Sequence, residues 1–290
     1  MRLFHRVNFF QYTVLGFAVA AGLIWFAVFK VEAAGGLLRV HFFDVGQGDA
    51  IFVEAENGNQ VLIDGGPNGS VLAKLGEVMP FWDKSIDIVI LTHPHADHLD
   101  GLIEVLKRYD IDMVLETGVS HSIPEYEEWR RLLKEKNVKV VVAKAGQKVQ
   151  LSDSVFLDIL APFGNFEGVS PKNVHDSMIV SKLVNGSASL LLMGDAEKQI
   201  EYRLLFSGAD MDADILKAGH HGSKTSTSEE FLRVVSPEVA VISAGRKNRY
   251  GHPHQEVIDR LESFGIKIFR TDIYGDVVFV SDGLTFQEMP

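Results

Sequence analysis

The chain has 290 residues, a formal net charge of −11 and no cysteine, and its apolar fraction of 46% is ordinary for a protein with a buried core. Without cysteine, disulfide bonds and thiolate metal sites are excluded, so any metal ion must be held by imidazole and carboxylate groups. The negative charge disfavours sequence-independent coating of nucleic acid, so a phosphate-bearing substrate must be attracted by a local basic patch or by bound cations.

The N-terminal region differs from the rest of the chain. Residues Phe9 to Phe29 include no charged side chain, and as a helix they would rise about 30 Å, enough to cross a bilayer. Arg2 and Arg6 precede this segment, so the positive-inside rule predicts a single-pass protein of the cell membrane whose main domain is extracytoplasmic. The alternative is a signal peptide cleaved near Val31-Glu32-Ala33, which would give a secreted protein. Residues 1–36 comprise this anchor or signal peptide and a short joint.

Residues 37–290 are predicted to form one α/β domain. Strands between residues 38 and 63 form a meander, and helical segments then alternate with Val/Ile-rich strands as far as residue 142. Residues 149–193 return to hairpin strands, and the last third again alternates helix with strand. Two halves, each with a meander and helices, predict two sheets packed face to face with helices outside, a four-layer αββα sandwich.

The strongest chemical signal is the run Thr92-His93-Pro94-His95-Ala96-Asp97-His98, which follows an apolar strand and precedes a helix. Three imidazoles and a carboxylate so close together are costly to pack unless each finds a partner, and a bound cation would satisfy them all. His93 and His95 lie on one side of an extended segment and can share one metal ion, whereas Asp97 and His98 can reach a second. The alternative is a polar helix cap formed by Asp97.

Two acidic residues each follow an apolar strand and lie next to a glycine. Asp195 ends Leu-Leu-Leu-Met-Gly-Asp, and its two oxygens can bridge two metal ions, although it could instead cap the next helix. Asp64, in Ile63-Asp64-Gly65-Gly66, could orient a metal-bound imidazole from behind, or could simply form a turn.

A third His-rich strand end is Lys217 to Lys224, which contains His220 and His221 between glycines. One of these imidazoles can complete the second metal site, and the other would face the substrate. A fourth cluster, His252-Pro253-His254, follows the cations Arg246, Lys247 and Arg249. This loop is interpreted as a phosphate-contacting segment, with an extra metal site or a solvated basic loop as alternatives.

Together these motifs resemble the metallo-β-lactamase superfamily. Within it, the segments Phe43-Asp-Val-Gly-Gln-Gly-Asp-Ala50 and Asn248-Arg-Tyr-Gly-His-Pro-His254, with the doubled His, resemble the hydrolase domain of ComEC-type competence proteins. The resemblance spans about residues 38 to 285 and implies an αββα sandwich with a two-metal site. His93 and His95 would bind one ion, Asp97, His98 and His221 would bind the other, and Asp195 would bridge them. His220 would then face the substrate, unless the roles of His220 and His221 are reversed.

The chain departs from the family pattern in two respects. Many members have a His ligand before the strand that corresponds to residues 178–184, and here either His175 supplies it or water completes the first metal site. ComEC-type proteins also carry a multi-helix channel domain, whereas this sequence has one hydrophobic segment. A separate channel protein is therefore an expected partner.

Two such ions, zinc or manganese, would activate a bridging hydroxide for attack on a phosphoryl centre. The predicted enzyme is a metal-dependent phosphodiesterase or nuclease, acting on nucleic acid, single-stranded DNA included, or on a phosphate-containing envelope polymer. His220 and Lys224 would stabilise the transition state or protonate the leaving group, and His252 would assist them. Further contacts to substrate or ligands are expected from Ser223, Arg246, Arg249 and His254.

Two other functions fit the same residues. The metal ions could serve a carbon-ester, lactone or lactam hydrolase. Alternatively, the domain could be a non-catalytic binding module in which the His clusters hold structural metal in a closed coordination sphere.

Overall fold

The computed structural model describes residues 9–33 and 36–289, and the chain divides into two compact units, Met1–Gly36 and Leu37–Pro290. The first unit contains helix α1 (Phe9–Ala33). No helix in the described part of the chain is long and apolar enough to span a membrane, so the predicted transmembrane helix is not supported. The extracytoplasmic and secreted placements stay predictions.

The second unit is built on two β-sheets. The strands of the first sheet are β1 (Leu38–Phe42), β2 (Ile51–Glu54), β3 (Gln60–Ile63), β4 (Ser85–Ile90), β5 (Asp110–Glu116), β6 (Lys139–Val142), β14 (Val277–Ser281) and β15 (Phe286–Met289). Those of the second sheet are β7 (Lys148–Gln150), β8 (Val155–Ala161), β9 (Val180–Asn185), β10 (Ala188–Leu192), β11 (Ile215–Lys217), β12 (Val239–Ile242) and β13 (Lys267–Arg270). The strand orders are β15-β14-β1-β2-β3-β4-β5-β6 and β13-β12-β11-β10-β9-β8-β7.

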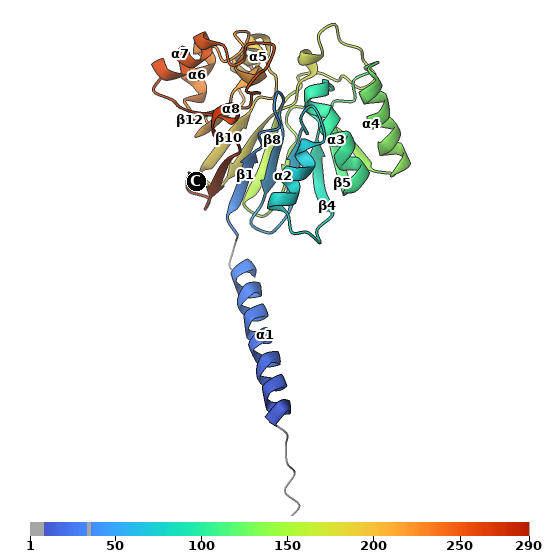
Figure 1. Ribbon diagram of the computed structural model, residues 1–290. Helices are drawn as coiled ribbons and strands as arrows, with labels where there is room; N and C mark the ends of the chain where they lie inside the picture. The colour runs from blue at the N-terminus through green and yellow to red at the C-terminus, as the bar shows by residue number, and fades with distance from the viewer. Residues whose placement is uncertain (1–8, 34–35, 290) are drawn as a thin grey trace, which may run out of the picture. The chain divides into compact units, whose positions relative to one another are not determined.

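Helices cover the outer face of each sheet, as Figure 1 shows for the domain that follows α1. On the first sheet lie α2 (Ser70–Val78), α3 (Ala96–Arg108) and α4 (Pro124–Glu135). On the second lie α5 (Lys198–Ser207), α6 (Glu229–Val235) and α7 (Gln255–Ser263), and the short helix α8 (Thr271–Tyr274) follows β13. The predicted sandwich of two sheets with helices outside is confirmed.

Alternation along the strands explains the layers. In β1, Val40 and Phe42 face the core between the sheets, which also contains Leu157 of β8 and Leu190 of β10. Burying each such side chain contributes about 1.5–3 kcal/mol, so the two apolar sheet faces hold each other together. The edge strand β15 is absent from the predicted elements because it is mostly exposed and has no apolar run.

The topology brings several loops to one region. Strands β3, β4 and β5 are parallel to one another, as are β10, β11 and β12, so the residues after them emerge at the carboxyl ends of both sheets. Hydrogen bonds join these loops: Asp64 N donates to the Ile90 carbonyl at 2.9 Å, and Ile179 N donates to the Thr92 carbonyl at 3.1 Å. The acidic and His-rich strand ends of the sequence therefore meet at one place.

Candidate metal centre

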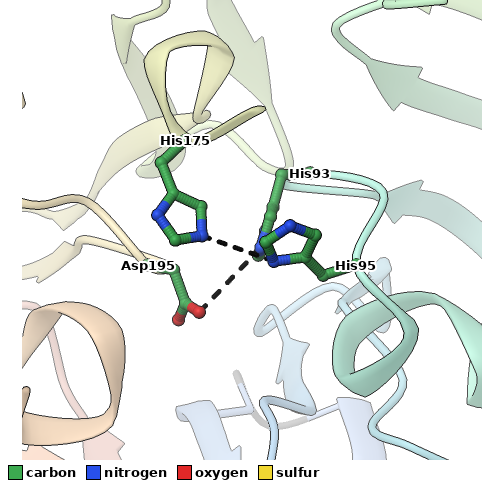
Figure 2. A group of neighbouring side chains, drawn as sticks. All are labelled: His93, His95, His175 and Asp195. Carbon is green, nitrogen blue, oxygen red and sulfur yellow. Dashed lines mark hydrogen bonds and ion pairs between the residues drawn. The ribbon is translucent and has the colours of Figure 1, made fainter. Parts of the chain in front are cut away.

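Four side chains converge as a first ligand group. His93 and His95 follow β4, His175 lies in the 3₁₀ helix η1 (Val174–Ser177), and Asp195 follows β10. Each offers one ligand atom, and these atoms all lie within 4.8 Å of one another. In Figure 2, Nε2 of His175 points at Nδ1 of His95, 3.3 Å away, and Nε2 of His93 is 3.9 Å from Oδ2 of Asp195. The sequence left open whether His175 or water completes the first metal site. In the structure, His175 lies within reach of that site.

Asp97, His98 and His221 form a second ligand group, also within 4.8 Å. His221 lies in the 3₁₀ helix η2 (Gly219–Gly222), and its Nε2 is 3.6 Å from Oδ2 of Asp97. Asp195 links this group to the first, because its Oδ1 is 3.3 Å from Nε2 of His221 and its Oδ2 is 3.3 Å from Nε2 of His98, while Oδ2 is also 3.9 Å from Nε2 of His93 in the first group. One carboxylate therefore contacts imidazoles of both groups.

Asp64 lies behind both groups and is fully buried. Its carboxylate accepts hydrogen bonds from Nδ1 of His98 at 2.7 Å and from the Thr92 hydroxyl at 2.7 Å. Because that hydroxyl gives its hydrogen to Asp64, its oxygen accepts from Nδ1 of His93, 3.2 Å away. Both imidazoles are thereby held by Nδ1 with Nε2 facing the centre, an arrangement common behind metal-bound histidines. The Nδ1 of His221 is held similarly, 3.0 Å from the Ser243 carbonyl.

The polar atoms that face the centre fit a bound cation. Among the buried side chains of the described residues, Nε2 of His93, His98 and His221 and Oδ1 of Asp195 have no hydrogen-bond partner. Buried polar atoms without partners are costly, and imidazole nitrogens with carboxylate oxygens are the donors that zinc and manganese accept. The donor set therefore fits divalent metal ions.

The electrostatics of the two groups differ. Burial, with the neighbouring His98, lowers the pKa of His93 well below its ordinary value, and burial lowers the pKa of His95 to about 4. Both are neutral ligands at pH 7. Burial opposes charge on His98 and His221 too, but the Asp195 carboxylate outweighs it and raises the pKa of both imidazoles well above the usual value. Without a cation, protons on His98 and His221 balance the buried acid.

This difference predicts that metal binding releases protons. A cation must displace the protons held on His98 and His221, so we expect about two protons to leave when the metal-free protein is loaded at pH 7. Since protons and cations compete, metal affinity should fall as pH decreases. Calorimetric titration in two buffers of different ionisation enthalpy measures the release, and a binding enthalpy that does not change with the buffer would contradict the prediction.

A row of imidazoles leads away from the ligand groups. The ring centroids are 4.8 Å apart for His175 and His220, 5.5 Å for His220 and His252, and 5.1 Å for His252 and His254. Nδ1 of His220 is 3.3 Å from Oε1 of Glu197, and its Nε2 is 3.9 Å from Oδ2 of Asp195. His220 is partly exposed whereas His221 is buried, so the geometry favours His221 as ligand and His220 as the substrate-facing imidazole.

The remaining predicted residues lie around this row. Ser223 Oγ is hydrogen-bonded to Thr225 at 3.0 Å, and the backbone N of Lys224 donates to Nδ1 of His254 at 3.3 Å. Within residues 36–289, no described hydrogen bond or ion pair joins Ser223 or the side chain of Lys224 to the ligand groups. Their roles stay predictions.

The two arginines of the basic loop are exposed. Arg246 Nε donates to the Asp272 carbonyl at 3.2 Å, and Arg249 donates to the Tyr250 hydroxyl at 2.8 Å. Tyr250 and, to a smaller extent, the Asp97 carboxylate raise the pKa of Arg249, so this guanidinium lies within electrostatic range of the second ligand group. Contact of either arginine with phosphate stays a prediction.

Sequence reasoning missed three charged side chains beside the ligands. Asp49 and Lys217 form a fully buried ion pair, and Glu197 lies against His175 and His220. A lysine that ends an apolar strand, and an acid in a glycine-rich loop before another strand, were signals for the first two. The sequence could not show that Asp49 and Lys217 pair with each other.

Comparison with known proteins decides the family. The sequence model described as the metallo-beta-lactamase superfamily matches residues 43–246. The chain belongs to the metallo-β-lactamase superfamily. This confirms the resemblance that the motifs indicated and, at the level of the family, a metal-dependent hydrolase. The fold agrees: the metallo-β-lactamase fold protein YhfI of Bacillus subtilis aligns with a TM-score of 0.57 and 13% identity, covering 84% of this chain and all of that one.

Relatives in the superfamily include competence-type proteins. The chain is 33% identical to the ComE operon protein 3 of Bacillus subtilis, over 88% of this chain and 34% of that protein. It is 32% identical to the competence protein ComA of Neisseria gonorrhoeae, over 83% of this chain and 32% of that protein. The chain thus spans about a third of the length of these relatives.

Proposed function

We propose that this protein is a phosphodiesterase, with nucleic acid as its substrate class, that works with two divalent cations held at the two ligand groups. The observation that carries the proposal is the shared carboxylate of Asp195, within 3.3 Å of imidazoles on both His98 and His221 and 3.9 Å from His93. A carboxylate common to two ligand sets is what a two-metal hydrolytic centre needs. Zinc and manganese both suit the donors.

Divalent cations bound there would polarise a phosphoryl oxygen and make a nucleophilic water available at neutral pH. The chain's own groups would hold and orient the substrate. Nε2 of His220 faces the centre while Nδ1 lies beside the Glu197 carboxylate, so this imidazole is placed to contact the substrate.

His252 is the next imidazole after His220 in the row that leads away from the ligand groups. Burial, then the neighbouring His221, lowers its pKa to about 4, so it is neutral at pH 7. Its Nδ1 is buried and has no hydrogen-bond partner among the described residues. An unpaired polar atom in a loop that also carries the exposed Arg249 supports binding of an anionic, oxygen-rich group such as phosphate.

The names of the relatives favour nucleic acid over other phosphate esters. Besides the competence proteins, the chain is 32% identical to the recombination protein 2 of Haemophilus influenzae over 86% of this chain and 30% of that protein. Competence and recombination both concern DNA. We therefore propose single-stranded DNA as a substrate, with a separate channel protein as partner and a phosphate-containing envelope polymer as the alternative substrate.

The test is a substrate screen of the full chain loaded with Zn²⁺ or Mn²⁺. We expect metal-dependent cleavage of labelled single-stranded DNA and of bis(p-nitrophenyl) phosphate, abolished by chelation and by His95→Ala. Hydrolysis of a lactone or of nitrocefin without phosphodiester cleavage would instead support a carbon-ester or lactam hydrolase. Bound metal without any hydrolysis would support the binding module.

A variant of His252 tests the role of the imidazole row. Replacing His252 with Ala removes a hydrogen-bonding group that would meet charged phosphate, and such a bond contributes about 1.5–3 kcal/mol, or roughly ten- to hundredfold in kcat/KM. The metal content should not change, because His252 belongs to neither ligand group. The control is His121→Ala, which removes a partly exposed imidazole outside the row. Equal kcat/KM values for the two variants would contradict the prediction.

A further inference from the structure

The loop between β1 and β2, residues 43–50, carries the family-like segment to which no role has been assigned. It is packed tightly against the second ligand group: a Cβ added at Gly48 would lie 2.0 Å from the carbonyl oxygen of Asp97. Gly48 has a φ of +133°, a conformation that side chains disfavour. Asp49, near the end of the loop, has a buried carboxylate, with 1% of the residue exposed. The loop thus delivers one buried acid directly behind the metal ligands.

The partner of Asp49 is a lysine from the other sheet. Lys217 ends β11, is completely buried, and forms an ion pair with Oδ2 of Asp49. The same ammonium donates a hydrogen bond to the carbonyl oxygen of Gly194 at 2.9 Å. Gly194 precedes Asp195 and has a φ of +51°, so Lys217 contacts the backbone turn that presents the shared carboxylate. A buried ammonium is tolerated only with such partners.

Asp49 also lies behind two imidazoles of the second group. Its Oδ1 is 3.5 Å from Nδ1 of His221 and its Oδ2 is 4.0 Å from Nδ1 of His98, whereas the Nε2 atoms of both rings face Asp195. Apart from the ion pair, neither oxygen of Asp49 has a hydrogen-bond partner among the described residues. Asp49, His98 and Asp195 offer ligand atoms within 4.8 Å of one another. They could therefore hold a cation at a position other than that of the second ligand group.

We infer that Asp49 and Lys217 are a positioning pair that directs the second cation to Asp97, His98, His221 and Asp195. The inference rests on the proposed two-cation centre. Lys217 occupies the cation-binding face of Asp49, so a metal ion cannot bind there, and its hydrogen bond to Gly194 orients Asp195. Asp49 in turn keeps the ammonium away from the second cation and adds negative charge behind the two rings.

The experiment is a Mn²⁺ titration of the full-length protein, followed by calorimetry and by electron paramagnetic resonance. In the wild type we expect two ions and the spin-coupled signal of a close manganese pair. In Asp49→Asn, the unpaired ammonium should lower the affinity for the second ion about ten- to hundredfold and leave the first unchanged. In Lys217→Gln, the freed carboxylate should change the spectrum of the second ion, and Lys217→Arg should restore it.

The control is Glu116→Gln, which neutralises another buried acid, 1% exposed and held by Trp129 and Arg130, and should leave both affinities unchanged. Second-ion affinity and spectrum equal to wild type in both neutral variants would overturn the inference. If either neutral variant does not fold, the double variant Asp49→Asn/Lys217→Gln, which leaves no buried charge unpaired, takes its place. Wild-type second-ion affinity in that variant would also overturn it. A wild type that binds a single ion would refute the two-cation proposal instead.

Discussion

Replacing Asp195 with Asn is expected to lower phosphodiester hydrolysis by about a thousandfold or more, because several kcal/mol of transition-state stabilisation by metal ions would be lost. The carboxylate is buried, within 3.3 Å of the imidazoles of His98 and His221 in the second group and 3.9 Å from that of His93 in the first. An amide offers one ligand oxygen without the negative charge, so it cannot serve both groups. Metal analysis of the purified variant should find fewer ions per chain than in the wild type.

The loss of hydrolysis in Asp195→Asn must be distinguished from an effect of the substitution on folding. Removing the charge leaves His98 and His221 without the carboxylate that stabilises their protonated forms, so the metal-free variant should also have a different thermal midpoint from wild type. Asp214→Asn is a matched control, because Asp214 accepts a backbone hydrogen bond from Ser189 at 2.7 Å at the opposite end of β11. A variant of Asp195 that keeps wild-type metal content and turnover would refute the shared-carboxylate centre.

Replacing Asp64 with Asn is expected to weaken metal binding at both groups by about ten- to hundredfold. The carboxylate accepts from the His98 ring directly, and through the Thr92 hydroxyl it orients the His93 ring. In the variant, the NH₂ group would face at least one other donor, and the unmet hydrogen bond should lower the free energy of unfolding by about 1–3 kcal/mol. Calorimetry gives the affinities, and denaturant titration of the metal-free protein gives the stability.

The backbone does not complicate this test. Asp64 has a φ of 59°, a left-handed conformation that Asn adopts as readily as Asp, so the substitution changes only the side chain. Asp87→Asn is the control, because Asp87 accepts the backbone N–H of Gln60 at 2.6 Å in β4 without touching a ligand. If Asp64→Asn weakened only the second group, the path through Thr92 to His93 would be wrong.

The sequence by itself predicted the layers and most of the candidate ligands. Period-two alternation in strands such as 38–42 and the apolar faces of helices such as 96–108 are local patterns, so they predict a sandwich without knowledge of contacts. His93, His95, Asp97 and His98 lie within one short run, and their spacing alone predicts a metal site. Asp195 follows a strand in the same way, which indicated a second candidate ligand at a strand end.

Only the tertiary structure decided how the distant residues complete the site. The left-handed backbone of His220 and His221 sends adjacent rings in different directions, so the sequence could not choose between them. His175 reaches His95 where the segment after η1 is hydrogen-bonded to the residue after the His-rich run's strand, Ile179 N to the Thr92 carbonyl. Asp49, in the β1–β2 loop of the first sheet, meets Lys217 at the end of β11 in the second. Such pairings depend on how two sheets stack, since strand register and loop path are set by contacts far apart in sequence. The run from His93 to His98 therefore predicts that a metal binds, and the packing of the sheets determines which residues surround it.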